Sequence, residues 1–233
     1  INWEKLALGL TEFEGSRENN IVFGHGAAGK TIDQDGGMVF YDPNAPDNQK
    51  FKLIIGRVDL YSSPDGINWK LSYPSVLTFK PDSIIKHHLD SQNIIFWDES
   101  INKYVAFGRK NTNKGRSIFR GESETLDKFP IINDLPIVLT PDSLDLKYGD
   151  IHLVDYYMSA AIKYPWADNA YYMFPTAYFH YIPDYISEFK NGFPRNAGPL
   201  HTQFAASTDG KIWHRYDRKP FINLGMKGEF DWA

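Results

Sequence analysis

Four polar clusters precede short apolar runs or end the chain, and each holds residues able to do acid–base or polar-binding chemistry. Carboxylates and imidazoles can donate or accept a proton, and a carboxylate can also attack a substrate directly. Amides and guanidinium groups bind polar ligands. The clusters are Arg17–Asn20, His87–Asn93, Lys147–Asp150 and Gly228–Asp231.

Spacing within two of these clusters is typical of a strand with one polar face. His88, Asp90 and Gln92 alternate, and Asp150 is followed two residues later by His152. Residues two apart share a face of a strand, and a face buried in a core would not tolerate this stripe. His88, Asp150 and His152 could hold a divalent ion, or both histidines could be structural. No close ligand spacing such as H-E-x-x-H is present. We therefore assign no metal ligand and no cofactor, although a central divalent ion is compatible with the residues.

A phosphate-loop pattern occurs at Gly24–Thr31, which reads GHGAAGKT. A working loop of this kind lies between a strand and a helix. Ile21–Phe23 could be the strand, but the residues after Thr31 have no helical periodicity and include the pair Gly36-Gly37. They lead into Met38–Tyr41, which is expected to be another strand. The pattern predicts a hairpin and no nucleotide site.

The composition of the chain excludes several classes of protein function. The 233 residues carry a net charge of −4 and no basic footprint for nucleic acid. No apolar stretch reaches the length of a membrane span. The absence of cysteine excludes thiol catalysis. Residue 1 is Ile, so we expect the natural chain to begin upstream and its signal region to lie outside this sequence. One domain over residues 1–233 is expected.

A repeated turn indicates the fold. The frame S-x-D-G-x-x-W occurs at Ser63–Trp69 and Ser207–Trp213, with a degenerate copy at Ser123–Phe129, and Ile1-Asn2-Trp3 matches its tail. Asp-Gly forms a tight turn with Gly at positive φ, and the Trp is expected to anchor the next strand between neighbouring sheets. Strand-rich repeats of this size predict the four-stranded blades of a propeller.

Propeller geometry brings distant residues together. The innermost strand of every blade runs in the same direction along the central channel, so residues at the strand starts meet at one rim. This predicts a site formed by residues from four blades. The predicted members are Asn20, Asp90, Asp150 and Glu229 or Asp231.

Several segments together carry a family resemblance. They are Asp90–Asp98 (DSQNIIFWD), Lys103–Arg109 (KYVAFGR), Ser207–Trp213 (STDGKIW) and Gly228–Asp231 (GEFD). With them, the chain resembles bacterial glycosidases related to the five-bladed β-propeller glycoside hydrolases, a superfamily that includes invertase-like and arabinanase/xylosidase-like enzymes. The resemblance covers the whole chain and implies an all-β, five-bladed β-propeller. About four blades would be present, cut at both ends.

The resemblance implies hydrolysis of a poly- or oligosaccharide by carboxylates around a central funnel. By blade position, Asp90 would be the base or nucleophile, Asp150 a pKa modulator or transition-state stabiliser, and Glu229 the acid, with Asp231 as its competitor. The invertase-like W-x-N-D-P-N-G and Arg-Asp-Pro sequences are absent. The expected location is the periplasm or exterior of a bacterium, where such enzymes degrade polysaccharides.

Other residues are expected to bind substrate, and other functions remain open. Asn20 would bind a sugar hydroxyl or cap a strand, and His88, Gln92 and His152 would line the funnel. Arg109, with Arg120, could pair with an acidic substrate. A non-catalytic carbohydrate-binding propeller would need such groups without a carboxylate pair, and a purely structural propeller would need neither.

Overall fold

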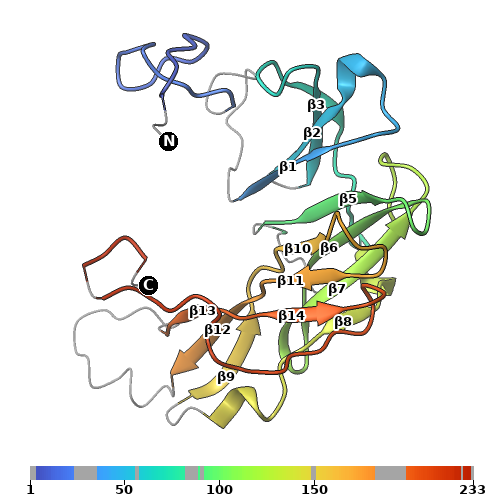
Figure 1. Cartoon of the computed structure of the whole chain (residues 1–233), viewed down its shortest axis with the longest axis vertical. Helices are drawn as coiled ribbons and strands as arrows, with labels where there is room; N and C mark the ends of the chain where they lie inside the picture. Colours follow the sequence, from blue (N-terminus) through green and yellow to red (C-terminus); the bar gives the residue numbers. More distant parts are fainter. Residues whose placement is uncertain are drawn as a thin grey trace.

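The computed structural model describes residues 4–23, 36–55, 58–81, 89, 92–147, 151–181, 198–226 and 228–231. Almost all regular structure in these residues is antiparallel β-sheet (Figure 1). The exceptions are the single 3-10 turns η1 (Asp47–Gln49), η2 (Ile132–Asp134) and η3 (Asp145–Lys147). No described helix is long and apolar enough to cross a membrane.

Two four-stranded meanders form the first half of the fold. The first sheet has the order β1-β2-β3-β4 and the middle sheet the order β5-β6-β7-β8, so neighbours in sequence are neighbours in space. This is the four-stranded antiparallel sheet predicted from the repeats. The strands are β1 (Gly37–Tyr41), β2 (Phe51–Ile55), β3 (Asp59–Ser63), β4 (Lys70–Tyr73), β5 (Ile94–Asp98), β6 (Lys103–Thr112), β7 (Gly115–Ser123) and β8 (Ile137–Leu139).

The third sheet is a similar meander whose strands are interrupted. Its two three-stranded parts have the orders β13-β12-β9 and β10-β11-β14. The parts join because the Tyr157 amide donates to the Thr176 carbonyl and the Thr176 amide to the Met158 carbonyl. The strands are β9 (Ile151–Tyr156), β10 (Ala161–Lys163), β11 (Tyr171–Met173), β12 (Thr176–Tyr181), β13 (Leu200–Thr202) and β14 (Ala205–Ser207).

The interruption of the third sheet has a local cause. Ala160 has a φ of 42°, and Pro175 has no N–H to donate to a ladder. Both lie where two strands of the sheet break. Beyond β14, a bridge pairs Ala206 with His214 and supplies the start of a fourth strand.

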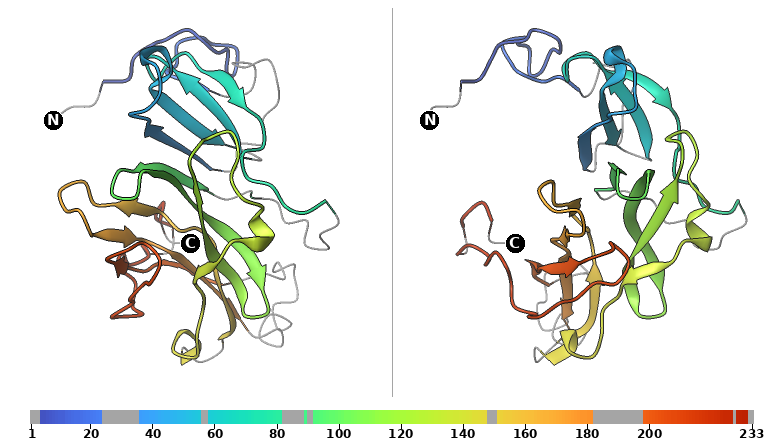
Figure 2. Two further views of the ribbon diagram at one scale, coloured as in Figure 1. Left: turned by 90° about the vertical axis from the view of Figure 1, so that its right-hand side faces the viewer. Right: turned by 45° about the vertical axis from the view of Figure 1, so that its right-hand side comes forward.

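The hydrophobic cores lie between the sheets. Successive residues of a strand point to opposite faces, so the middle sheet is apolar on both sides. Ile95 and Phe119 pack with Leu60 of the first sheet. On the other face, Phe107 packs with Met173 of the third sheet. Figure 2 shows the three sheets following one another in an arc, with the middle sheet between its neighbours. The chain is therefore a series of sheets packed face to face, and five blades around one axis stays a prediction.

The repeated turn forms as predicted. Asp209 accepts hydrogen bonds from the amides of Lys211 and Ile212 (2.8 and 2.9 Å), and Gly210 has a φ of 68°. The matching turn is formed by Asp65, which accepts hydrogen bonds from the amides of Ile67 and Asn68 (both 2.8 Å), and by Gly66, which has a φ of 75°. The indole of Trp213 lies edge-on to Phe107 of the middle sheet at 6.0 Å. This Trp thus lies between two sheets, as expected.

The expectation of a strand at Ile21–Phe23 is wrong. The Asn19 side chain accepts the Ile21 amide (3.1 Å) and donates to the Thr11 carbonyl (2.8 Å), so these backbone groups bond locally rather than in a ladder. The first strand among the described residues begins at Gly37 instead. The phosphate-loop pattern lies wholly outside the described residues. β1 begins after it, at Gly37, but the predicted hairpin lacks its first strand because Ile21–Phe23 is not one.

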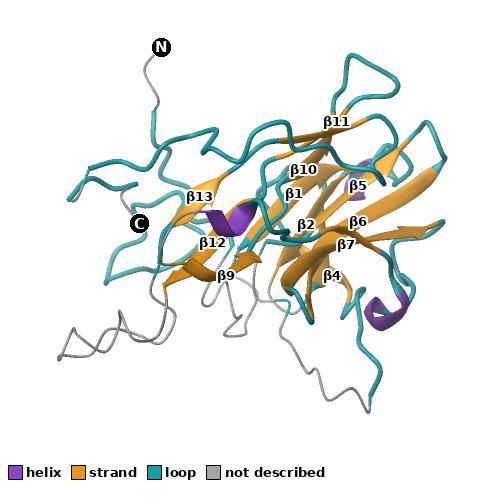
Figure 3. Cartoon of the chain, turned by 90° about the horizontal axis from the view of Figure 1, so that it is seen from below, coloured by secondary structure: helices purple, strands orange, loops and turns teal. Residues whose placement is uncertain are grey.

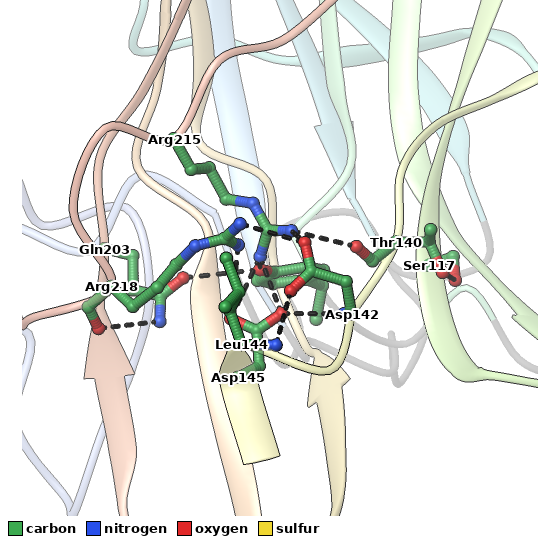
Figure 4. A network of polar contacts seen from close by, with 9 residues as sticks. Ser117, Thr140, Asp142, Leu144, Asp145, Gln203, Arg215 and Arg218 are labelled. Atoms are coloured by element: carbon green, nitrogen blue, oxygen red, sulfur yellow. Dashed lines mark hydrogen bonds and ion pairs between the residues drawn. The ribbon is translucent and has the colours of Figure 1, made fainter. Parts of the chain in front are cut away.

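A buried ion network holds the outer edge of the third sheet (Figure 4). Asp145, in η3 between the middle and third sheets, is fully buried and accepts from Arg215 (2.8 and 3.0 Å) and Arg218 (3.3 Å). Arg215 also donates to Asp142 (2.8 Å) and to the hydroxyl of Tyr156. Burial raises the pKa of Asp142, but the Leu144 amide and the two guanidinium groups outweigh this and leave it below its usual value. The network ties the connection after β8 to the chain beyond β14.

Replacing Arg215 by Ala is expected to lower the free energy of unfolding by about 3 kcal/mol or more, because it leaves the buried Asp145 carboxylate poorly paired. Arg218→Ala is the matched control and should cost about 1 kcal/mol, since Arg215 would still neutralise Asp145. Urea unfolding of both variants measures the difference. Equal losses would contradict the role given to Arg215.

Candidate functional site

The first strands of the three sheets run in the same direction. The starts of β1 and β5 lie close together. A Cβ added at Gly36, just before β1, would lie 3.0 Å from the backbone nitrogen of Gln92, just before β5. At their ends, Tyr104, whose partner in β5 is Trp97, donates its hydroxyl proton to Asp42 just after β1 (2.9 Å). Lys163 of β10 likewise pairs with Asp98 at the end of β5 (2.9 Å). The starts of these strands therefore share one end of the molecule. Figure 3 shows the sheets from below, with their strands in orange.

A buried carboxylate lies at that end. Asp155 of β9 is 5% exposed, and its Oδ2 lies 2.9 Å from His180 Nε2 of β12. Its Oδ1 accepts the Arg116 amide at 2.6 Å, and the Arg116 side chain approaches Oδ2 at 3.6 Å. These contacts dock the tip of the β6–β7 hairpin of the middle sheet on the first strand of the third.

The docking explains the glycine at the hairpin tip. Gly115 has a φ of 101°, and a Cβ there would lie 2.8 Å from both Asp155 Oδ1 and the Val154 carbonyl oxygen. A larger residue would push the hairpin away from β9. The close approach of backbone and carboxylate thus depends on the absence of a side chain at position 115.

Two guanidinium groups and two tyrosines surround this carboxylate. Arg109, 8% exposed, lies 4.2 Å from the ring centroid of Tyr157 and donates to its carbonyl at 3.4 Å. Arg116 lies 5.3 Å from the same ring. Tyr178 packs on Tyr157 at 6.2 Å and on His180 at 4.1 Å. We call Asp155, His180, Arg109, Arg116 and Tyr157 the rim cluster.

Strand register places the rim cluster relative to the strand starts. Ile94, the first residue of β5, pairs with Phe107 of β6, so Arg109 lies two residues beyond the start of β5. Arg116 pairs with Asn111, a further two residues along. The cluster therefore extends beyond the start of β5, on the side where the site was expected from the sequence.

The charge state of Asp155 follows from its contacts. Burial raises the pKa of this carboxyl, but the hydrogen bonds from His180 and the Arg116 amide and the charge of Arg116 outweigh it, so the pKa lies below its usual value. At neutral pH Asp155 is thus a carboxylate with both oxygens engaged. It is suited to orienting His180 and Arg116, and it has no proton to donate to a leaving group.

Three of the predicted site residues belong to this end of the molecule. Arg109 is part of the rim cluster, and His152 of β9 touches it, with Nδ1 3.1 Å from the His180 carbonyl oxygen. Gln92 lies directly before β5, half-buried, beside Gly36. Asp90, Asp150 and His88 lie outside the described residues.

The remaining predicted residues lie elsewhere. Asn20 is exposed in the segment before the first sheet, where Phe23 packs on Tyr61 of β3 at 4.7 Å. Glu229 and Asp231 are exposed in a turn after the bridge that joins Ile222 to Thr202.

That turn brings two predicted carboxylates together. Glu229 Oε2 accepts the Met226 amide (2.8 Å), and the Asp231 carbonyl accepts the Gly225 amide (3.0 Å). A Cβ added at Gly225 would collide with both carboxyl groups. The described contacts do not join this pair to the rim cluster.

Sequence reasoning missed Asp155, His180 and Arg116. It chose the acidic residue at the start of the apolar run, Asp150, and not the one inside it. The available signal was an aspartate within Ile151–Tyr156, because a charge inside an apolar strand requires a buried partner. Nothing in the sequence identified His180 as that partner. Within the described part of the chain, no three potential metal ligands lie close enough to hold an ion.

Comparison with solved structures identifies the fold. The protein is similar to BT0996 in its RGII complex (TM-score 0.54, 14% identity, covering 81% of this protein and 57% of that one). It is also similar to a glycoside hydrolase (0.53, 13%, 81% and 57%) and to a thermostable family-43 glycoside hydrolase (0.52, 16%, 82% and 56%). The chain has the fold of these glycoside hydrolases. It spans a little over half the length of each of them.

Sequence comparisons add no closer relationship. No protein-family model matches the chain, and no curated protein matches it. The likeness is therefore one of fold, as the resemblance in the repeated turns had suggested.

Asp155→Asn tests the electrostatics of the rim cluster. Because its folded pKa is depressed, the ionised carboxylate contributes stability above its unfolded pKa of about 3.9, and this contribution is lost as pH falls through the lower folded value. At pH 7 the variant should be less stable by about 1–3 kcal/mol. Thermal unfolding from pH 7 to pH 2.5 should show the wild-type advantage shrinking below about pH 4. A pH-independent difference would contradict the assignment.

Proposed function

We propose that the protein is a glycoside hydrolase that acts on a poly- or oligosaccharide at the rim where the first strands begin. The observation that carries the proposal is the rim cluster, a buried ionised carboxylate together with a histidine, two arginines and a tyrosine. Its presence at the strand starts of a fold shared with solved glycoside hydrolases supports this function. Fold alone would not, because one fold serves many functions.

The proposed chemistry needs two carboxyl groups with different protonation states. One, still protonated, donates to the glycosidic oxygen, and the other, ionised, activates water or attacks the anomeric carbon. We propose Asp90 as the base or nucleophile, Asp150 as the transition-state stabiliser and Glu229 as the acid, with Asp231 as the alternative acid. These roles come from position along the chain.

The described residues supply binding and positioning in this scheme. Asp155 fixes His180 and Arg116, while Arg109 and Gln92 offer hydrogen-bond donors beside the strand starts. The edge of Tyr157 and the ring of Tyr178 give an apolar surface for a sugar ring. Two guanidinium groups would also favour a substrate that carries a carboxylate. We further propose that the protein acts outside the bacterial cytoplasm, on polysaccharide.

A non-catalytic carbohydrate-binding module is the second candidate. It is favoured by one specific observation: Asp155 is ionised and both its oxygens are already hydrogen-bonded. Such a carboxylate suits binding and positioning better than proton transfer. The two candidates differ in whether a second carboxyl group completes the site.

The replacement Asp90→Asn separates these candidates, because it removes a base or nucleophile and keeps the shape of the side chain. We expect the wild type to hydrolyse at least one of arabinan, xylan and galactan, and the variant to lose about a hundredfold or more of kcat. Affinity for the same polysaccharide should remain. Reducing-sugar release and binding are measured on both proteins.

Asp127→Asn is a matched control, an exposed aspartate in the degenerate turn, and should retain full activity. Undiminished hydrolysis by Asp90→Asn would remove Asp90 from the mechanism. Binding without hydrolysis by the wild type would favour the module.

A further inference from the structure

The first sheet carries a polar groove along its edge strand β4. The groove encloses about 550 Å³ and extends over the connections that follow β1 and β3. Its lining includes side chains from η1, from the end of β3, from the repeated turn and from β4. Those that bear on the argument are Asn48, Gln49, Ser62, Asn68, Ser72 and Tyr73.

We propose that this groove binds a neutral oligosaccharide. Three side-chain amides offer both donors and acceptors, which match the hydroxyl groups of a sugar. Tyr73 is 42% exposed, and its ring provides the apolar surface on which the C–H face of a sugar packs. Lys70 is the one formally charged group among the described lining residues, so the groove does not select a polyanion.

A buried hydrogen-bond chain orients the hydroxyl groups of the groove. Lys52 is 3% exposed, and its Nζ donates to Ser62 Oγ at 2.9 Å. Ser72 Oγ also donates to Ser62 Oγ, at 2.6 Å. Because Ser62 accepts from both, its own hydroxyl proton is left to be donated to a ligand in the groove it lines. The Lys52 ammonium is in turn 3.9 Å from the Asp42 carboxylate, which offsets part of the cost of its burial.

Asn68 is held in a similar way. Its Nδ2 donates to Asp65 Oδ2 at 2.8 Å within the repeated turn. This leaves the amide oxygen of Asn68 as an acceptor of fixed orientation. A donor at Ser62 and an acceptor at Asn68, both pre-positioned, lower the entropy lost on binding a sugar.

The groove is separate from the rim cluster. Asn48 and Pro64 follow the ends of β1 and β3, whereas the rim cluster lies beyond the start of β5. A sugar chain held in the groove would keep the protein on a polysaccharide without occupying the proposed hydrolytic site. The inference therefore goes beyond the proposed hydrolysis and does not require it.

Affinity gel electrophoresis of the full chain in arabinan, xylan and galactan tests the groove, with polygalacturonate as the charged comparison. At least one neutral polysaccharide should retard the protein, and Tyr73→Ala should weaken the retardation about tenfold. Ser72→Ala is a second variant, expected to weaken it by about threefold or more through loss of the hydrogen-bond chain.

Tyr41→Ala is the matched control, because Tyr41 is an exposed tyrosine on β1 of the same sheet, outside the groove. Its retardation should stay within about twofold of wild type. The proposal is overturned if none of the neutral polysaccharides retards the protein, if only polygalacturonate does, or if both groove variants behave like Tyr41→Ala.

Discussion

Face-to-face packing of the middle sheet against both of its neighbours is the constraint on which the rest of the structure depends. β5, β6 and β7 alternate apolar residues on two faces, and one face completes a core with the first sheet while the other completes a core with the third. Burying a side chain such as Phe107 contributes about 1.5–3 kcal/mol. Because each core needs residues from two sheets, the sheets cannot be repositioned independently.

Polar contacts then fix the details that apolar packing leaves open. At one end, Gly115 lets the β6–β7 hairpin approach β9 closely enough for Asp155 to accept the Arg116 amide. At the outer edge, Asp145 and Arg215 join the chain after β8 to the chain after β14. Each of these charges is buried and paired, so removing one partner costs more than the pair itself contributes. The rim cluster is therefore held from two sheets at once, which is how a rigid binding site is built.

The parts of this structure that could be predicted from the sequence are those with local signals. The S-x-D-G-x-x-W frame predicted turns at Asp65 and Asp209 because the side-chain and glycine chemistry lies within five residues. The run Ile94–Trp97 predicted β5 for the same reason. The strand expected at Ile21–Phe23 failed because Asn19 satisfies that backbone with its side chain, a competition that apolar runs do not reveal.

The site was harder to predict because its contacts are not local. Arg109 and His152 lie at the end of the molecule where the first strands begin, but the partner of Asp155 is His180, which is 25 residues away. Counting from the start of the apolar run selected Asp150, whereas the carboxylate that contacts the β6–β7 hairpin is Asp155. Spacing along a strand predicts which face of the sheet a residue lies on, but not which residues of the neighbouring sheet it lies beside.

One spatial claim is central to the proposed function: sugar binds where the packed sheets bring their first strands to a common end. A crystal structure of the Asp90→Asn protein with the longest oligosaccharide that it binds tests this claim most directly. We expect a sugar residue within hydrogen-bonding distance of Arg109 or Gln92, with a second sugar packed against Tyr157 or Tyr178. A structure in which the rim cluster makes no contact with any bound sugar would contradict the claim.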